Sequence, residues 1–162
     1  MFASDTSADA PGNHSRHVAR GFATASPVSD TPRFIDDVER ILTDTATDLL
    51  LPTFEEAFAL ARHRARLDPL TRLFAADFEL LRKLHDKAAF LRLAEELGLP
   101  VHPSIIATSR GELIDAAKAF GRYFARAAYS RSGARIASNA GPLAGKRRLE
   151  SCDPTPANPY VV

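Results

Sequence analysis

Two cations in the second half of the chain stand where phosphate groups could bind. Lys87 follows Asp86 at the start of a predicted helix, so its ammonium can reach an anion as a mobile point charge beside the positive helix end. Arg126 lies within an otherwise apolar strand, where its guanidinium needs a partner, and phosphate is a good bidentate one. The small-residue turn after this strand can present backbone N–H groups to the same anion. Its candidate residues are Ser130, Ser132 and Gly133.

Each of these assignments has a structural alternative. Lys87 can be an ordinary surface lysine, and Arg126 can face solvent from a sheet that is covered on one side only. Two further candidates, Glu55 and Glu56, follow a short apolar segment that closes at Pro52. Carboxylates at the end of a parallel strand could hold an amine or a proton, but they could equally complement the helix dipole.

The composition excludes several classes of protein. The chain has 162 residues, 45% hydrophobic and 25% charged, which is typical of one globular domain. Its single cysteine, Cys152, excludes an internal disulfide and a zinc site built from cysteines. No apolar run approaches the roughly 20 residues of a membrane helix, and residues 1–6 do not show the basic region and apolar core that are typical of a secretory signal. We therefore expect a cytoplasmic protein without a membrane partner.

Charge is distributed unevenly along the chain. Residues 1–60 carry 4 basic and 10 acidic side chains, whereas residues 61–162 carry 17 basic and 10 acidic ones. Within the second group, residues 122–148 contain seven basic side chains and no acidic one. Such a segment suits a polyanion, either nucleotide phosphates or nucleic acid, although it could also be a solvated surface.

Helices and strands are expected to alternate around these residues. An amphipathic helix is predicted over 34–46, a buried parallel strand over 48–52 and another helix over 54–66, which is the pattern of an α/β sheet. Tyr160–Val162 has the character of a strand whose partner the sequence leaves undefined. Later helices are predicted after Asp77 and over 87–97 and 111–120, and later strands over 104–108, 123–129 and 134–137.

The order of these features resembles the ATP-grasp superfamily, which contains biotin carboxylase and the large subunit of carbamoyl-phosphate synthetase. The matching segments are Pro52–Glu56, Asp86–Lys87, Leu97–Val101, Phe120–Gly121, Arg126 and Tyr129–Gly133. The resemblance implies an α/β protein in two parts. Residues 1–76 would be a partial pre-ATP-grasp, Rossmann-like domain with a parallel sheet and helices. Residues 77–162 would be the helix-strand segment that opens an ATP-grasp α+β domain, truncated.

The resemblance also implies roles for the candidate residues. Lys87 and Arg126 would contact the nucleotide phosphates, and Ser130, Ser132 and Gly133 would belong to the lid loop that closes over ATP. Glu55 and Glu56 would face the acceptor substrate. The chain departs from the family at Ala127, where proline is usual, and in its lid loop, which has a single glycine, Gly133.

Members of this family join a carboxylate to an amine or thiol through an acyl-phosphate made from ATP, held as Mg-ATP. The implied partners are therefore a nucleotide and a small carboxylate, and not nucleic acid. The adenine-binding hinge and the Mg²⁺ ligands of the family would follow Val162, so we expect an incomplete fragment with weak or lost ATP binding. The alternatives are a non-enzymatic module that binds nucleic acid through residues 122–148, or a truncated product without a function of its own.

Overall fold

The computed structural model describes residues 1–130 and 135–162, which form two compact units, Met1–Leu81 and Arg82–Val162. The chain mixes helix and strand, with 41% of residues in helices and 16% in strands. Strands pair in parallel in the first unit and antiparallel in the second. The predicted general class, α/β, is therefore confirmed. No helix of the described residues is both long and apolar enough to span a bilayer.

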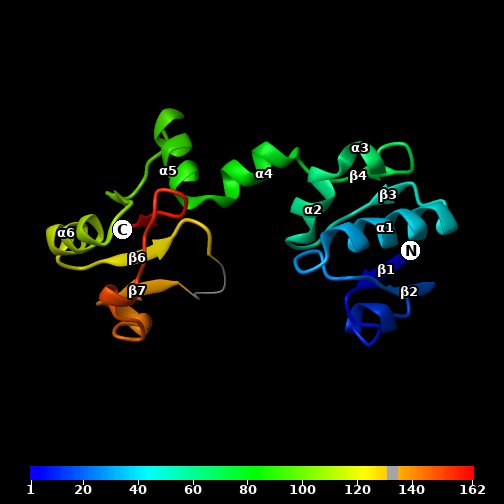
Figure 1. Ribbon diagram of the computed structural model, residues 1–162, viewed down its shortest axis with the longest axis horizontal. Coiled ribbons are helices and arrows are strands. Elements are labelled where there is room, and N and C mark those ends of the chain that lie inside the picture. Colours follow the sequence, from blue (N-terminus) through cyan, green and yellow to red (C-terminus); the bar gives the residue numbers. More distant parts are fainter. Residues whose placement is uncertain (131–134) are drawn as a thin grey trace. The chain divides into compact units, whose positions relative to one another are not determined.

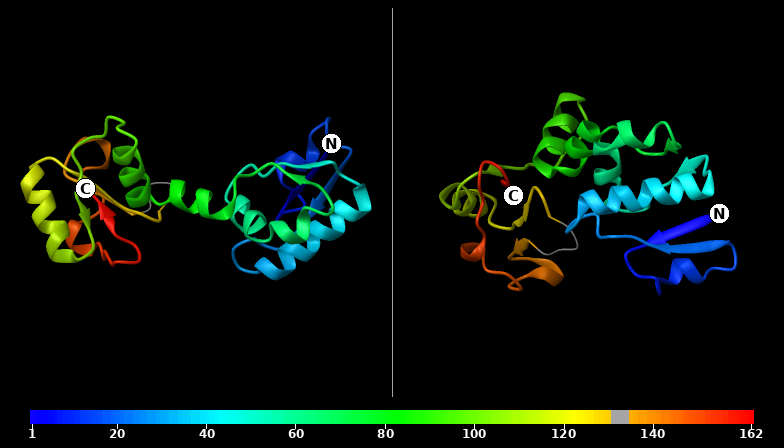
Figure 2. Two further views of the ribbon diagram at one scale, coloured as in Figure 1. Left: turned by 90° about the horizontal axis from the view of Figure 1, so that it is seen from above. Right: turned by 45° about the vertical axis from the view of Figure 1, so that its right-hand side comes forward.

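The first unit contains two separate pairs of parallel strands (Figures 1 and 2). Strand β1 (Phe2–Asp5) pairs with β2 (Arg20–Ala23), and β3 (Leu49–Leu50) pairs with β4 (Arg72–Leu73). The other elements are η1 (Pro11–His14), α1 (Thr31–Thr45), α2 (Glu56–Arg62) and α3 (Arg64–Leu67). The parallel pairing predicted for residues 48–52 is correct, but the described strands form two pairs rather than one sheet.

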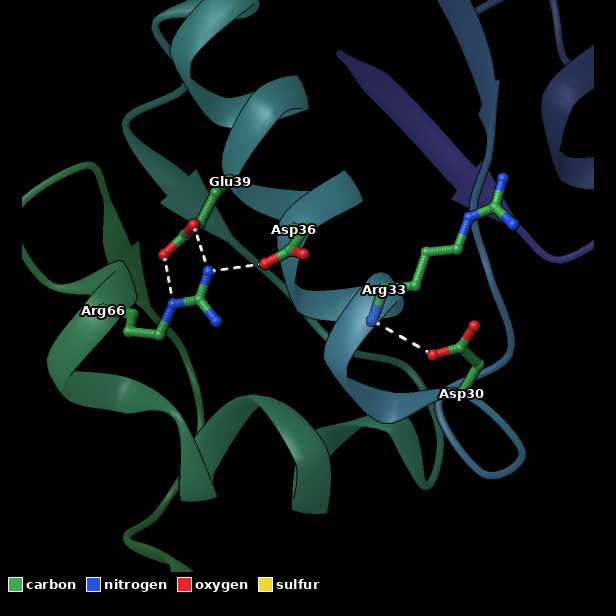
Figure 3. Close-up of polar contacts among 5 residues, drawn as sticks. All are labelled: Asp30, Arg33, Asp36, Glu39 and Arg66. Atoms are coloured by element: carbon green, nitrogen blue, oxygen red, sulfur yellow. Dashed lines mark hydrogen bonds and ion pairs between the residues drawn. The ribbon is translucent and has the colours of Figure 1, made fainter.

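Helix α1 supplies most of the first core. Its N-cap is Asp30, whose carboxylate accepts a hydrogen bond from the backbone N–H of Arg33, so the helix starts three residues before the predicted position (Figure 3). Its apolar side packs against α2, α3 and β4. The cluster consists of Phe34, Ile35, Val38, Leu42, Leu60, Leu67 and Leu73.

An arginine on α3 also ties that helix to α1. The guanidinium of Arg66 donates to Glu39 with its Nε at 2.8 Å and to Asp36 with an Nη at 2.7 Å (Figure 3). These two carboxylates raise the pKa of Arg66. The charged network therefore lies over the apolar contact between the same two helices.

Two predictions for the first unit are wrong in detail. The helix expected over 54–66 breaks at His63, which separates α2 from α3. The strand expected over 48–52 has only two residues in the ladder, and it is not buried: Leu49 is 47% exposed and Leu51 57% exposed. Leu50, whose side chain points to the other face, packs against the first core, so the segment is covered on one face only.

The second unit is built around a four-stranded antiparallel sheet in the order β5-β8-β6-β7. Figure 1 shows two of its strands, β6 and β7, side by side. The boundary between the units falls within α4 (Phe78–His85). The remaining elements are α5 (Lys87–Glu96), β5 (Ile106–Ala107), α6 (Arg110–Phe120), β6 (Phe124–Ala127), β7 (Ile136–Ser138), η2 (Gly141–Leu143), η3 (Leu149–Ser151) and β8 (Tyr160–Val161).

The last strand lies inside the sheet rather than at its edge. Tyr160 is paired with Ala107 on one side and Ala127 on the other, and Val162 exchanges backbone hydrogen bonds with Ile105. The strand character predicted for 160–162 is correct, and the structure supplies both of the partners that the sequence left undefined.

The two faces of this sheet differ sharply. One face is buried, and alanines at alternate positions allow α6 and the segment around Cys152 to pack closely against it. On β6 the residues between these alanines, Phe124 and Arg126, point to the other face and are exposed. We call this second surface the open face of the sheet.

Candidate functional site

Lys87 links the start of α5 to the loop that follows β6. Its Nζ donates hydrogen bonds to the carbonyl oxygens of Ala128 at 3.0 Å and Ser130 at 2.7 Å. Its backbone N–H also donates to the Ala128 carbonyl at 3.3 Å. An ammonium group has three N–H donors, and the described residues use two of them, so a third can serve an anion.

The N-terminal end of helix α5 has fewer N–H donors available for an anion than the sequence predicts. The carboxylate of Asp86 accepts hydrogen bonds from the N–H groups of Ala88 at 2.9 Å and Ala89 at 3.0 Å. The N–H of Lys87 is bonded to Ala128, and that of Phe90 to the carbonyl of Asp86. Because these first-turn groups are occupied, the helix can support a phosphate through its dipole but not through free N–H donors.

Arg126 reaches the open face from the central part of the sheet. It is paired in register with Ile136 on β7 and Val161 on β8. Its side chain is exposed, and the structure gives it no hydrogen bond or ion pair to any of the described residues. The two apolar neighbours and Phe124, 46% exposed, surround this cation with nonpolar surface. A charge in such a place remains available to a ligand.

The electrostatics place Lys87 and Arg126 within range of each other. Burial lowers the pKa of Lys87, the charge of Arg126 lowers it further, and the charge of Asp86 acts in the opposite direction. Nearby His85, whose ring centroid is 6.2 Å from that of Tyr129, has a lowered pKa because of burial and the charge of Lys87. The site therefore carries an excess of positive charge that an anion would relieve.

Residues 128–130, which follow the strand of Arg126, are held by hydrogen bonds from two parts of the second unit. Besides the bonds from Lys87, the side-chain oxygen of Asn158 accepts from the N–H of Tyr129 at 2.8 Å, and the N–H of Ala128 donates to the carbonyl of Pro159 at 2.7 Å. The hydroxyl of Ser130 donates to the carbonyl of Ala127 at 2.8 Å. Two other predicted lid residues, Ser132 and Gly133, lie outside the described residues.

Glu55 and Glu56 belong to the first unit, at the start of α2. One carboxylate oxygen of Glu56 accepts hydrogen bonds from the N–H groups of Thr53 at 2.7 Å and Phe54 at 3.0 Å. This side chain thus holds the loop after β3 in the same way as a helix-capping carboxylate. A role for either glutamate toward an acceptor substrate stays a prediction.

The described residues do not provide an evident metal site. Within 1–130 and 135–162, no three side chains of the His, Cys, Asp and Glu types come together in a group that could hold an ion. The cations of the second unit suit phosphate groups, whereas a Mg²⁺ ion would need carboxylate or carbonyl oxygens around it.

Two residues of this region were not among the sequence candidates. Phe124 shares the open face with Arg126, and the alternation Phe-Ala-Arg-Ala could have indicated this because side chains two apart in a strand point the same way. Asn158, which orients the loop at Tyr129, had no such signal because the contact joins residues 29 positions apart.

Two comparisons with known proteins were negative. A scan against models of protein families gives no match. A search of curated proteins also gives none.

Proposed function

We propose that the second unit binds the phosphate groups of a nucleotide in the manner of an ATP-grasp protein. The observation that carries the proposal is the link from the Nζ of Lys87 to the carbonyls of Ala128 and Ser130. It holds a lysine at a helix start beside the loop that follows the strand of Arg126. A triphosphate on the open face would receive charge-assisted hydrogen bonds from both cations.

The chemistry that the resemblance implies is ATP-dependent ligation of a carboxylate to an amine or thiol. In that reaction, phosphoryl transfer depends largely on positioning and on neutralising the phosphate charge, to which metal ions contribute. Lys87 and Arg126 supply positive charge, but the described residues offer no cluster of metal ligands. We therefore propose that this chain contributes phosphate contacts and not the metal-dependent transfer step.

A titration with ATP, tripolyphosphate and adenosine tests the proposal directly. The intact chain should bind ATP and tripolyphosphate with comparable affinity, measured by isothermal calorimetry, and adenosine should compete with neither. Lys87→Met should weaken both anions about tenfold or more, because a charged hydrogen bond contributes roughly 1.5–3 kcal/mol. Arg126→Gln provides a second variant at an exposed position that does not depend on the internal contacts of Lys87.

Equal binding by the wild type and both variants would refute the assignment, and so would a failure of either polyphosphate to bind. The nucleic-acid alternative predicts a different result in the same calorimetric experiment. It requires tight binding of DNA or RNA with a steep dependence on salt concentration, whereas the present proposal requires the nucleotide to bind in preference to either polymer.

A further inference from the structure

A second cationic site lies in the same unit, at a cavity of ≈ 330 Å³ that the nucleotide proposal does not use. Two arginines, Arg135 and Arg147, contribute to its lining together with Tyr160. Tyr160 is paired with Ala127, whose side chain points away from the open face of the sheet. The cavity therefore opens on the side of the sheet opposite to Arg126.

The charges of both arginines affect the same group in the lining, the hydroxyl of Tyr160. Their charges oppose the rise in the pKa of Tyr160 that burial and its hydrogen bond to Cys152 produce. The only carboxylate in the described lining is that of Asp153, which is exposed and lies 3.5 Å from an Nη of Arg110. Because Arg110 partly offsets this negative charge, the cavity has a net positive charge.

Neutral hydrogen-bond donors complete the lining. The hydroxyl of Thr155 accepts from the N–H of Asn158 at 3.1 Å, so its own proton is available to another acceptor. The side-chain oxygen of Asn158 is used by Tyr129, which leaves the amide NH₂ group as its donor. Two guanidinium groups, one hydroxyl and one amide therefore surround the same space, and each of them can donate to an oxyanion.

We propose that this cavity binds the phosphate group of a small phosphomonoester. A phosphomonoester carries a charge of about −1.5 to −2 at neutral pH, which matches two guanidinium groups, whereas a carboxylate carries only one negative charge. The volume is at the lower end of the range for small-molecule sites, roughly 300–1,000 Å³, and leaves space for an organic group beside the phosphate. This site is separate from the phosphate contacts of Lys87 and Arg126 and does not depend on them.

The test is a titration of the intact chain, labelled with ¹⁵N, followed by the amide signals of Thr155, Asn158 and Tyr160. The probes are inorganic phosphate, glycerol phosphate and acetate at constant ionic strength. Both phosphates should shift these signals in a saturable way, and acetate should not. Arg135→Gln, at an exposed position, should weaken the binding about tenfold or more, and Arg147→Gln should do the same.

A matched control is Arg148→Gln, which removes the same charge next to Arg147 from an exposed side chain that is not part of the lining. This variant should bind phosphate like the wild type. Lys87→Met should remove phosphate-induced shifts at Ala128 and Ser130 but leave those of the cavity, so the two sites can fail independently. Absence of saturable shifts, equal binding by Arg135→Gln, or an equal response to acetate would each overturn the proposal.

Discussion

Replacing Arg126 by glutamine should change folding stability and phosphate binding in opposite directions. In the free protein the charge of Arg126 opposes that of Lys87, as the lowered pKa of the lysine indicates. Removing the guanidinium relieves this repulsion and breaks no hydrogen bond or ion pair that the structure gives between Arg126 and the described residues. In the complex, however, the same group would be one of the two cations that hold the triphosphate.

The two effects have different sizes. Exposed charge pairs are worth roughly 0.2–1 kcal/mol because water screens them, so the free energy of unfolding should rise by less than about 1 kcal/mol. A charge-assisted hydrogen bond to phosphate is worth roughly 1.5–3 kcal/mol, so the Kd for tripolyphosphate should increase about 10- to 150-fold. The pKa of Lys87 should rise toward its ordinary value in the variant, because one of the two influences that lower it is gone.

Urea denaturation and calorimetry measure these quantities separately, and NMR titration of the lysine side chain follows the pKa. Arg122→Gln is the matched control, since it removes an exposed arginine that precedes β6 in the same basic segment. If both variants lose the same affinity, the binding reflects overall charge and not a site on the open face. If Arg126→Gln instead unfolds the protein, the exposed position assigned to this residue is wrong.

Three further outcomes follow from the described contacts. Asp86→Ala should lower the free energy of unfolding by about 1 kcal/mol through loss of the α5 cap, and Asp86→Asn, which retains a capping oxygen, should lose less in urea denaturation. Because the pKa of His85 is lower in the folded than in the unfolded chain, the unfolded chain binds a proton at His85 at a higher pH than the folded chain does. The free energy of unfolding should therefore fall as the pH drops below about 6.5, and His85→Asn should reduce this loss. Arg66→Gln should slightly lower the urea concentration at the midpoint of unfolding, with a smaller effect at high salt. Arg66→Lys should recover only part of the loss, because lysine cannot form the same forked contact with two carboxylates.

Features that depend on neighbouring residues were predictable from the sequence. Asp86, expected at a helix start, caps α5, and Ser109, a favourable capping residue just before α6, accepts from the N–H of Glu112 at 3.3 Å. Gly98 and Gly121 end these two helices with φ of 67° and 65°, which glycine adopts without steric cost. These caps and helix ends are predictable because the interacting groups are at most a few residues apart. The residue type at each position therefore specifies the local geometry.

Features that depend on distant residues were not predictable in this way. The contact of Lys87 with Ser130 joins positions 43 apart. The placement of β8 between β5 and β6 likewise depends on pairing with two strands that lie far earlier in the chain. The occupation of the first N–H groups of α5 also requires Ala128 to approach the helix. The sequence therefore indicated the cations of the site but not the backbone groups that hold them.

The basic side chains of residues 122–148 do not all lie on one face of the sheet, because side chains alternate between faces along a strand. Arg126 lies on the open face, whereas Arg135 is opposite Ala127 in the ladder and lines the cavity on the other side, together with Arg147. A nucleic acid needs cations along one continuous surface, because its phosphates are regularly spaced. Cations on opposite faces of a sheet instead favour separate small anions, which is why the two phosphate proposals can be tested with independent substitutions.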